Sequence, residues 1–330
     1  MPTTSEGKRR RLIPLIVAVA CLALVDVSVR AAVPRAASFN AWNDWQATHK
    51  VAAIDALARR GGSPLVLMGS SMMDYAVDPG ALSKLLGLKR PVFNASLNGA
   101  EARLMDFWLL NVVVPRLRPR VVVIGVSSRE LNDLGEGTRR AFDAVRDSYG
   151  GRAVAGDLSP TERILELGER VSGLVRYRSL LRKPSRLFDA EPLEEGLAVS
   201  ALGAPTHSRR TDVYRTLPPI SGGFAVGGSS MRALDHLIGR LESLGIRVLL
   251  VEMPISPDGY ARHPNGIADY RSFQQAVAGF VAAKGLPFSD MLSPFPTTEW
   301  FGDTLHLNRR GRERFTRLLA GILAPSVADL

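Results

Sequence analysis

Residues 65–71 read LVLMGSS, a short apolar run followed at once by one glycine and two serines. Two later stretches contain similar apolar runs, VVVIG at 121–125 and RVLLV at 247–251. Runs that are apolar throughout, instead of alternating with polar residues, are typical of strands buried on both faces. The sequence therefore predicts an α/β protein with three layers, in which helices cover both faces of a central, mostly parallel sheet.

The remaining elements of this fold are predicted from the spacing of apolar residues between the runs. Further short strands are expected at 91–94 and near Phe288. Helices are expected at 36–60, 81–86, 100–117, 231–244 and 270–284, with a last helix that places Phe315, Leu319 and Leu323 on one face.

Residues 134–230 do not fit the alternation of strands and helices. They contain one strong helix pattern at 160–181, opened by Ser159 as a plausible N-cap, in a stretch rich in Gly, Pro and Ser. We interpret them as an insertion after the third strand. Such an insertion either covers the site as a lid or substrate-binding wall, or is a solvated addition.

The N-terminus carries a basic cluster, KRRR at 8–11, before an apolar run at 12–29. The run approaches the roughly 20 residues that cross a bilayer, and the positive-inside rule keeps a basic tail at 1–11 in the cytoplasm. We expect a single-pass membrane anchor at 12–29, a connecting helix at 30–63 and an extracytoplasmic domain at 64–330. A cleaved signal segment, which leaves a secreted protein, is the alternative.

Composition restricts the class of partner and the kind of site. The chain has 42 Lys+Arg against 32 Asp+Glu, a net charge of +10, which attracts anions in general. No motif of a nucleic-acid reader is present, so we expect no nucleic-acid partner. The single cysteine, Cys21, lies in the apolar run, which excludes disulfides and cysteine metal sites from the domain that follows.

Two polar motifs follow predicted strands. Ser71 stands at a strand-to-helix turn, where a serine can present its hydroxyl at the open edge of a sheet and its backbone N–H to an oxyanion. Taken alone, Gly-Ser-Ser is also an ordinary turn sequence. The second strand runs into NASLNGA at 94–100, where Gly99 either brings backbone amides close to a substrate oxygen or simply starts a helix.

A third motif, FGDTLHLN at 301–308, lies just before the last helix. Asp303 and His306 are three residues apart, so in a helical turn their side chains can meet. The carboxylate would then fix the imidazole tautomer and stabilise the imidazolium that forms when it takes a proton. The alternative is that Asp303 caps a turn, Asn308 caps the last helix and His306 only packs.

Together, GSS at 69–71, VFNASLNG at 92–99 and DTLHLN at 303–308 resemble the motifs of the SGNH (GDSL-like) hydrolase superfamily. The resemblance spans residue 65 to the C-terminus outside the insertion and implies the flavodoxin-like SGNH fold. It also implies a nucleophile at Ser71, a base at His306 and an orienting acid at Asp303. The backbone N–H groups of Ser71 and Gly99 are then oxyanion donors.

The third motif block of the superfamily is not matched. The family places an Asn side chain after the central strand as a third oxyanion donor, and here Ser127 stands in that position. Losing one such donor costs about 10²–10³ in rate. The third donor is therefore expected from Ser127, Ser128 or Asn98, or else catalysis is slow or lost.

With its N-terminal apolar run, the chain resembles a branch of envelope proteins that move or remove acyl groups, such as alginate O-acetylation proteins and the D-alanine transfer protein of teichoic acids. The resemblance implies an extracytoplasmic, membrane-tethered serine acyl-ester hydrolase or O-acyltransferase that acts on acylated cell-envelope glycans. The alternative is a catalytically impaired protein of the same fold that binds glycans or serves in assembly.

No cofactor and no metal are expected. Four other histidines, His49, His207, His236 and His263, lie singly without the spacing of metal ligands. Glu252, at the end of the fourth strand, is interpreted as structural.

Overall fold

The computed structural model describes residues 5–32, 42–176, 178, 199–205 and 214–330. The chain forms two compact units, one of residues 1–39 with 156–192 and the other of residues 40–155 with 193–330. The larger unit contains the whole sheet and every predicted site residue.

The sheet has five strands in the order β2-β1-β3-β4-β5, and all of the pairings are parallel. The strands are β1 (Leu65–Met68), β2 (Phe93–Asn94), β3 (Val121–Val126), β4 (Arg247–Glu252) and β5 (Phe288–Asp290). Every residue of the first three strands is buried, as is β4 after its first residue. The predicted parallel sheet with two covered faces is confirmed.

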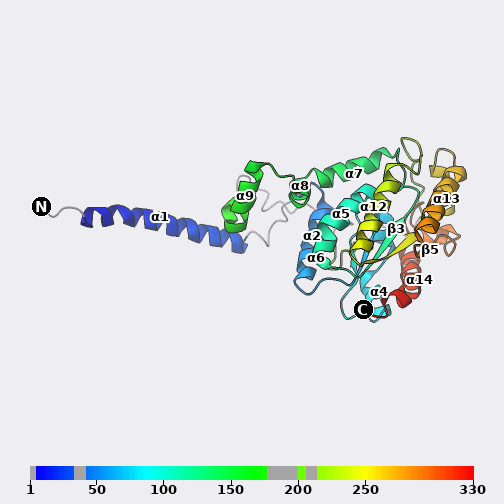
Figure 1. Cartoon of the computed structure of the whole chain (residues 1–330), viewed down its shortest axis with the longest axis horizontal. Coiled ribbons are helices and arrows are strands. Elements are labelled where there is room, and N and C mark those ends of the chain that lie inside the picture. The colour runs from blue at the N-terminus through cyan, green and yellow to red at the C-terminus, as the bar shows by residue number, and fades with distance from the viewer. Residues whose placement is uncertain (1–4, 33–41, 177, 179–198, 206–213) are drawn as a thin grey trace. The chain divides into compact units, whose positions relative to one another are not determined.

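Helices form the two outer layers of the larger unit. Figure 1 shows one group on one side of the sheet: α2 (Trp45–Ala58), α5 (Ala102–Trp108), α6 (Val114–Leu117) and α12 (Ser229–Ser243). On the other side, α14 (Arg309–Val327) packs against α3 (Ser71–Ala76) and α4 (Pro79–Leu85). Helix α13 (Ile267–Lys284) lies on the first side, because its Tyr270 and Gln274 contact Glu252, whose side chain points to the face of the sheet away from α3. The α/β/α architecture follows the prediction.

Shorter elements complete this unit. The helix predicted at 100–117 is α5, a π-helical turn η2 (Leu109–Val113) and α6 in succession. The other elements are α7 (Glu136–Arg146), α8 (Tyr149–Ala155) and the 3₁₀ turns η4 (Pro257–Arg262) and η5 (Thr298–Trp300). The helix predicted at 36–60 begins at Trp45 among the described residues and belongs to the larger unit, whereas residues 33–41 lie outside the described ranges.

The apolar run at 12–29 lies within one helix, α1 (Ser5–Ala32). Across the part of the chain that the structure describes, no helix combines the length and the apolar character needed to cross a bilayer. The structure therefore does not support the predicted anchor. The Asp26 carboxylate in this helix accepts hydrogen bonds from the Ser172 hydroxyl (2.6 Å) and the Leu174 N–H (3.0 Å), so this charged residue contacts protein.

The smaller unit packs α1 against part of the predicted insertion. Asp26 and its partner Ser172 join α1 to the start of α10 (Gly173–Arg176), which follows α9 (Pro160–Val171). Ser159 caps α9 in a full capping box, as its position predicted. The predicted helix 160–181 is shorter in the structure, because α9 ends at Val171, and residues 177 and 179–181 lie outside the described ranges.

Candidate functional site

Three of the predicted site residues follow three neighbouring strands of the sheet. Ser71 comes after β1, Gly99 after β2 and Ser127 directly after β3, and these strands are adjacent in the sheet. Because carboxyl ends of parallel strands meet at one edge, the fold gathers these residues at that edge.

Ser71 occupies the first position of α3, directly after a tight turn. The Ser70 hydroxyl caps the helix by accepting the Met72 N–H at 3.2 Å. Gly69 allows the helix to approach, because a Cβ there would lie 2.6 Å from the Cβ of Met73. Within the described ranges, the backbone N–H of Ser71 has no acceptor, as expected at the first turn of a helix.

Ser71, His306 and Asp303 form a continuous line of hydrogen bonds. Ser71 Oγ lies 2.8 Å from His306 Nε2, and His306 Nδ1 lies 2.8 and 3.1 Å from the two carboxylate oxygens of Asp303. Because carboxylate oxygens only accept, we assign the proton to Nδ1, which leaves Nε2 of the neutral ring free to accept the Ser71 proton. The three residues are 7 %, 6 % and 4 % exposed, so water has little access to these hydrogen bonds.

The acid of this line is itself held in place. Asp303 Oδ1 also accepts the backbone N–H groups of Leu305 and His306, each at 2.9 Å. The ring of Tyr75 packs edge-on against the His306 ring, with centroids 5.6 Å apart. Asn308 caps α14 by accepting the Gly311 N–H, as the alternative interpretation of this motif predicted. Asp303 closes a turn and also contacts the imidazole.

Gly99 stands in the loop beyond β2 with φ of +74°, a conformation that favours glycine. Its N–H has no acceptor in the described part of the chain. The N–H of the preceding Asn98 is different, because it donates to the side-chain oxygen of Gln46 at 2.7 Å. Of these three backbone N–H groups, those of Ser71 and Gly99 have no acceptor among the described residues, and their role as oxyanion donors stays a prediction.

The hydroxyls expected to supply a third donor are engaged elsewhere. Both the N–H (2.6 Å) and the hydroxyl of Ser127 donate to Glu130 Oε2. The Ser128 hydroxyl lies 2.7 Å from His263 Nε2, and Nδ1 of that ring faces the Tyr260 carbonyl at 3.3 Å. Burial lowers the pKa of His263, which favours the neutral ring. Because Nδ1 faces a carbonyl that only accepts, we assign the proton to Nδ1 and the Ser128 hydroxyl as donor to Nε2. With both hydroxyls engaged, Asn98 is the remaining candidate. Its Oδ1 is buried without a partner among the described residues, but a hydrogen bond to an oxyanion would have to come from its Nδ2 amide group.

Sequence reasoning missed Arg129. Its Nη2 lies 4.0 Å from the position that a Cβ would take on Gly99, and among the described residues no carboxylate pairs with its guanidinium. A cation beside this loop stabilises negative charge that develops on an oxygen there. The available signal was its place in the sequence, two residues after Ser127 at the end of the central strand.

This arrangement predicts unequal effects of two substitutions. Ser127→Ala should lower kcat on a chromogenic ester less than about 3-fold, because its hydroxyl already donates to Glu130, whereas a true oxyanion donor contributes about 10²–10³. Arg129→Gln should lower kcat about 10-fold, because it removes the nearby charge. Steady-state kinetics of both variants make the comparison, with melting temperatures measured alongside. The opposite ranking would restore Ser127 as the third donor.

The other singled-out residues have structural partners. Glu252 accepts the Tyr270 hydroxyl at 2.8 Å and the Gln274 amide at 3.0 Å, and burial raises its pKa. His49 Nδ1 faces the Trp45 carbonyl at 2.9 Å. His207 lies outside the described residues. Within the described ranges, no group of three His, Cys, Asp or Glu side chains is placed to hold a metal ion.

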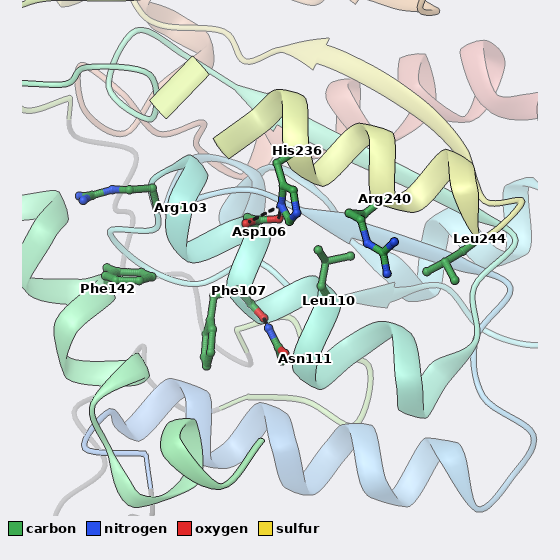
Figure 2. A pocket seen from close by; sticks show the side chains of 9 residues that line it. All are labelled: Arg103, Asp106, Phe107, Leu110, Asn111, Phe142, His236, Arg240 and Leu244. Carbon is green, nitrogen blue, oxygen red and sulfur yellow. Dashed lines mark hydrogen bonds and ion pairs between the residues drawn. The ribbon is translucent and has the colours of Figure 1, made fainter. Parts of the chain in front are cut away.

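A separate pocket of about 530 Å³ opens on the helical face between α5, η2, α7 and α12 (Figure 2). His236 and Asp106 meet across it, with Nδ1 2.9 Å from a carboxylate oxygen. The residues that line it are Arg103, Asp106, Phe107, Leu110, Asn111, Phe142, His236, Arg240 and Leu244. No predicted site residue is among them, so this pocket is distinct from the Ser71 site.

Comparison with known proteins finds similarity only at the level of structure. No family model and no curated protein matches the sequence. Solved structures do match. The chain is similar to GDSL-like esterases. A Bacteroides fragilis protein described as an acylhydrolase is 12 % identical, with a TM-score of 0.44 over 86 % of this chain and 98 % of that one.

Two further structures have related descriptions. A GDSL-like lipase from Bacteroides thetaiotaomicron is 10 % identical, with a TM-score of 0.44 over 87 % of this chain and 99 % of that one. An acetyl xylan esterase is 13 % identical, with a TM-score of 0.39 over 80 % and 99 %.

Proposed function

We propose that this protein is a serine acyl-ester hydrolase or O-acyltransferase in which Ser71 is the nucleophile, His306 the general base and Asp303 the acid that orients it. The observation that carries the proposal is the unbroken line from the Ser71 hydroxyl through both ring nitrogens of His306 to Asp303. A nucleophile within hydrogen-bond reach of a base, which is oriented by a third group, is the arrangement that nucleophilic catalysis requires.

The reaction has two halves. Ser71 Oγ attacks the ester carbonyl carbon while its proton passes to His306 Nε2, and the carbonyl electron pair moves onto the oxygen beside the N–H groups of Ser71 and Gly99. Collapse of this intermediate breaks the bond to the alcohol, which leaves with the proton from Nε2. Water or a sugar hydroxyl, deprotonated by His306, then attacks the acyl-enzyme and returns Ser71 to its starting form. Water gives a hydrolase, and a hydroxyl gives a transferase.

The proposed substrate is an acylated cell-envelope glycan, met outside the cytoplasm by a membrane-tethered chain. Support for this location comes from the sequence, namely the basic cluster at 8–11 before the apolar run at 12–29. Support for the substrate comes from the resemblance to envelope acyl-transfer proteins. Recovery of the full-length chain in the soluble fraction of its cells would contradict the tether, and release of acetate from acetylated glycans by the purified protein tests the substrate.

A second candidate function has one observation in its favour. The Ser127 hydroxyl donates to Glu130 and is therefore not available as the expected third oxyanion donor. A chain of this fold without sufficient oxyanion stabilisation would bind an acylated glycan and not turn it over.

Covalent labelling decides between these functions. The folded protein should react with a fluorophosphonate probe, and peptide mass spectrometry should place the adduct on Ser71. Among the described residues, Ser71 is the one serine whose hydroxyl contacts a histidine paired with a carboxylate, and this histidine raises its nucleophilicity. Protein unfolded in denaturant is the control and should not react. A folded protein without any adduct would favour the binding function.

A further inference from the structure

Helix α2 buries polar side chains where an amphipathic helix normally buries apolar ones. Gln46 is 5 % exposed and Lys50 is fully buried, and both lie on the same face as the apolar Ile54. A lysine without access to water is rare unless its charge is matched. These two residues therefore need partners inside the protein.

Lys50 finds three acceptors. Its Nζ lies 2.6 Å from Asp74 Oδ1 and 3.2 Å from the Asn94 carbonyl, and it also contacts the Ser96 carbonyl. Burial alone lowers the pKa of Lys50, and the Asp74 carboxylate opposes this effect. An ammonium group has three protons, one for each acceptor, whereas a neutral amine has only two protons. We therefore assign the charged form to Lys50. Lys50 thus joins helix α3, which contains Asp74, to the last residue of β2 and the chain just after it.

Gln46 makes a second connection between the same two segments. Its Nε2 donates to Asp74 Oδ2 at 2.6 Å, and its Oε1 accepts the Asn98 N–H at 2.7 Å. Asp74 is three residues after Ser71, and Asn98 immediately precedes Gly99. One side chain of α2 therefore contacts both the helix that begins with the nucleophile and the loop that contains the second oxyanion donor.

We propose that Gln46 and Lys50 are positioning residues that fix the separation between Ser71 and Gly99. This inference rests on the proposed function, because the two backbone N–H groups must converge on one substrate oxygen. A misplacement of about 1 Å in such a site costs up to about 100-fold in rate. Neither residue belongs to the motifs that resemble the superfamily, and both come from the helix predicted only to connect the N-terminus to the domain.

The test uses Gln46→Met, which keeps the length of the side chain and removes both hydrogen bonds. The control is Ile54→Val, a conservative change at a buried residue of the same helix that belongs to the hydrophobic core. We expect Gln46→Met to lower kcat on a small chromogenic ester, and the rate constant of fluorophosphonate labelling, about 10- to 100-fold, with KM changed less than about 2-fold. Ile54→Val should leave these quantities within about 2-fold at a comparable melting temperature.

Hydrogen exchange separates failure of this inference from failure of the proposed function, because it needs no activity. In Gln46→Met, amide exchange should increase in residues 94–99 and 71–76, and in Ile54→Val it should not. Wild-type exchange rates in both segments, or kcat and labelling equal to the wild type, would overturn the positioning role. Faster exchange in a protein whose wild type never reacts with the probe would support the connection and reject the catalytic function instead.

Discussion

Ser71→Ala should reduce kcat on a chromogenic acetyl ester by about 10⁴-fold or more, because the variant has no oxygen to form the acyl-enzyme. The residual rate would come from the oxyanion donors and from binding alone. The methyl group of alanine fits the space of the serine, and the backbone N–H of residue 71 remains. We therefore expect KM and the melting temperature to stay close to those of the wild type. Steady-state kinetics and thermal unfolding measure both quantities.

The chain offers a matched control for this variant. Ser128 also donates a hydroxyl to a buried histidine, His263, at 2.7 Å, but a backbone carbonyl and not a carboxylate faces the other ring nitrogen. Ser128→Ala should therefore keep kcat within about 3-fold. If Ser71→Ala retained more than a tenth of the wild-type rate, the nucleophile would have to be another residue, and equal losses in both variants would indicate a shared structural effect.

The fold could be predicted because its strands are buried on both faces. A run such as VVVIG at 121–125 has no polar residue that could face water, so both faces need a covering of helices. Parallel strands then bring their carboxyl ends to one edge, which is why Ser71 and Gly99, 28 residues apart, could be expected together. That His306 belongs to the same site was predicted only from the resemblance to a known arrangement of motifs.

The parts that could not be predicted depend on partners distant in sequence. The helical spacing of α2 did not reveal that Lys50 is buried, because its match is Asp74 in another helix. Likewise, the Ser127 hydroxyl seemed available until the structure placed Glu130 beside it. Asp26, a charged residue within the apolar run, is explained only by its hydrogen bond to Ser172, which lies 146 residues later. Polar contacts of this kind leave no periodic signal in a single sequence.

Asp303→Asn tests whether the third member of the line orients the base. The asparagine oxygen can still accept the N–H groups of Leu305 and His306, so the turn should persist. Its amide group, however, can donate to Nδ1 of the imidazole and so move the ring proton to Nε2, which then cannot accept the proton of Ser71. A wrong tautomer of this kind costs about 10⁴ in kcat in a serine protease triad. We expect a loss of similar size in ester hydrolysis, with KM and melting temperature little changed.

Asp290→Asn is the matched control, because Asp290 also closes a turn, by accepting the Leu292 N–H at 2.7 Å, and none of its hydrogen bonds to the described residues reaches an imidazole. It should keep the wild-type rate within about 2-fold. A fall in kcat of less than 10-fold in Asp303→Asn, with the fold intact, would mean that His306 keeps its tautomer without the carboxylate, and Asp303 would then serve only to close the turn.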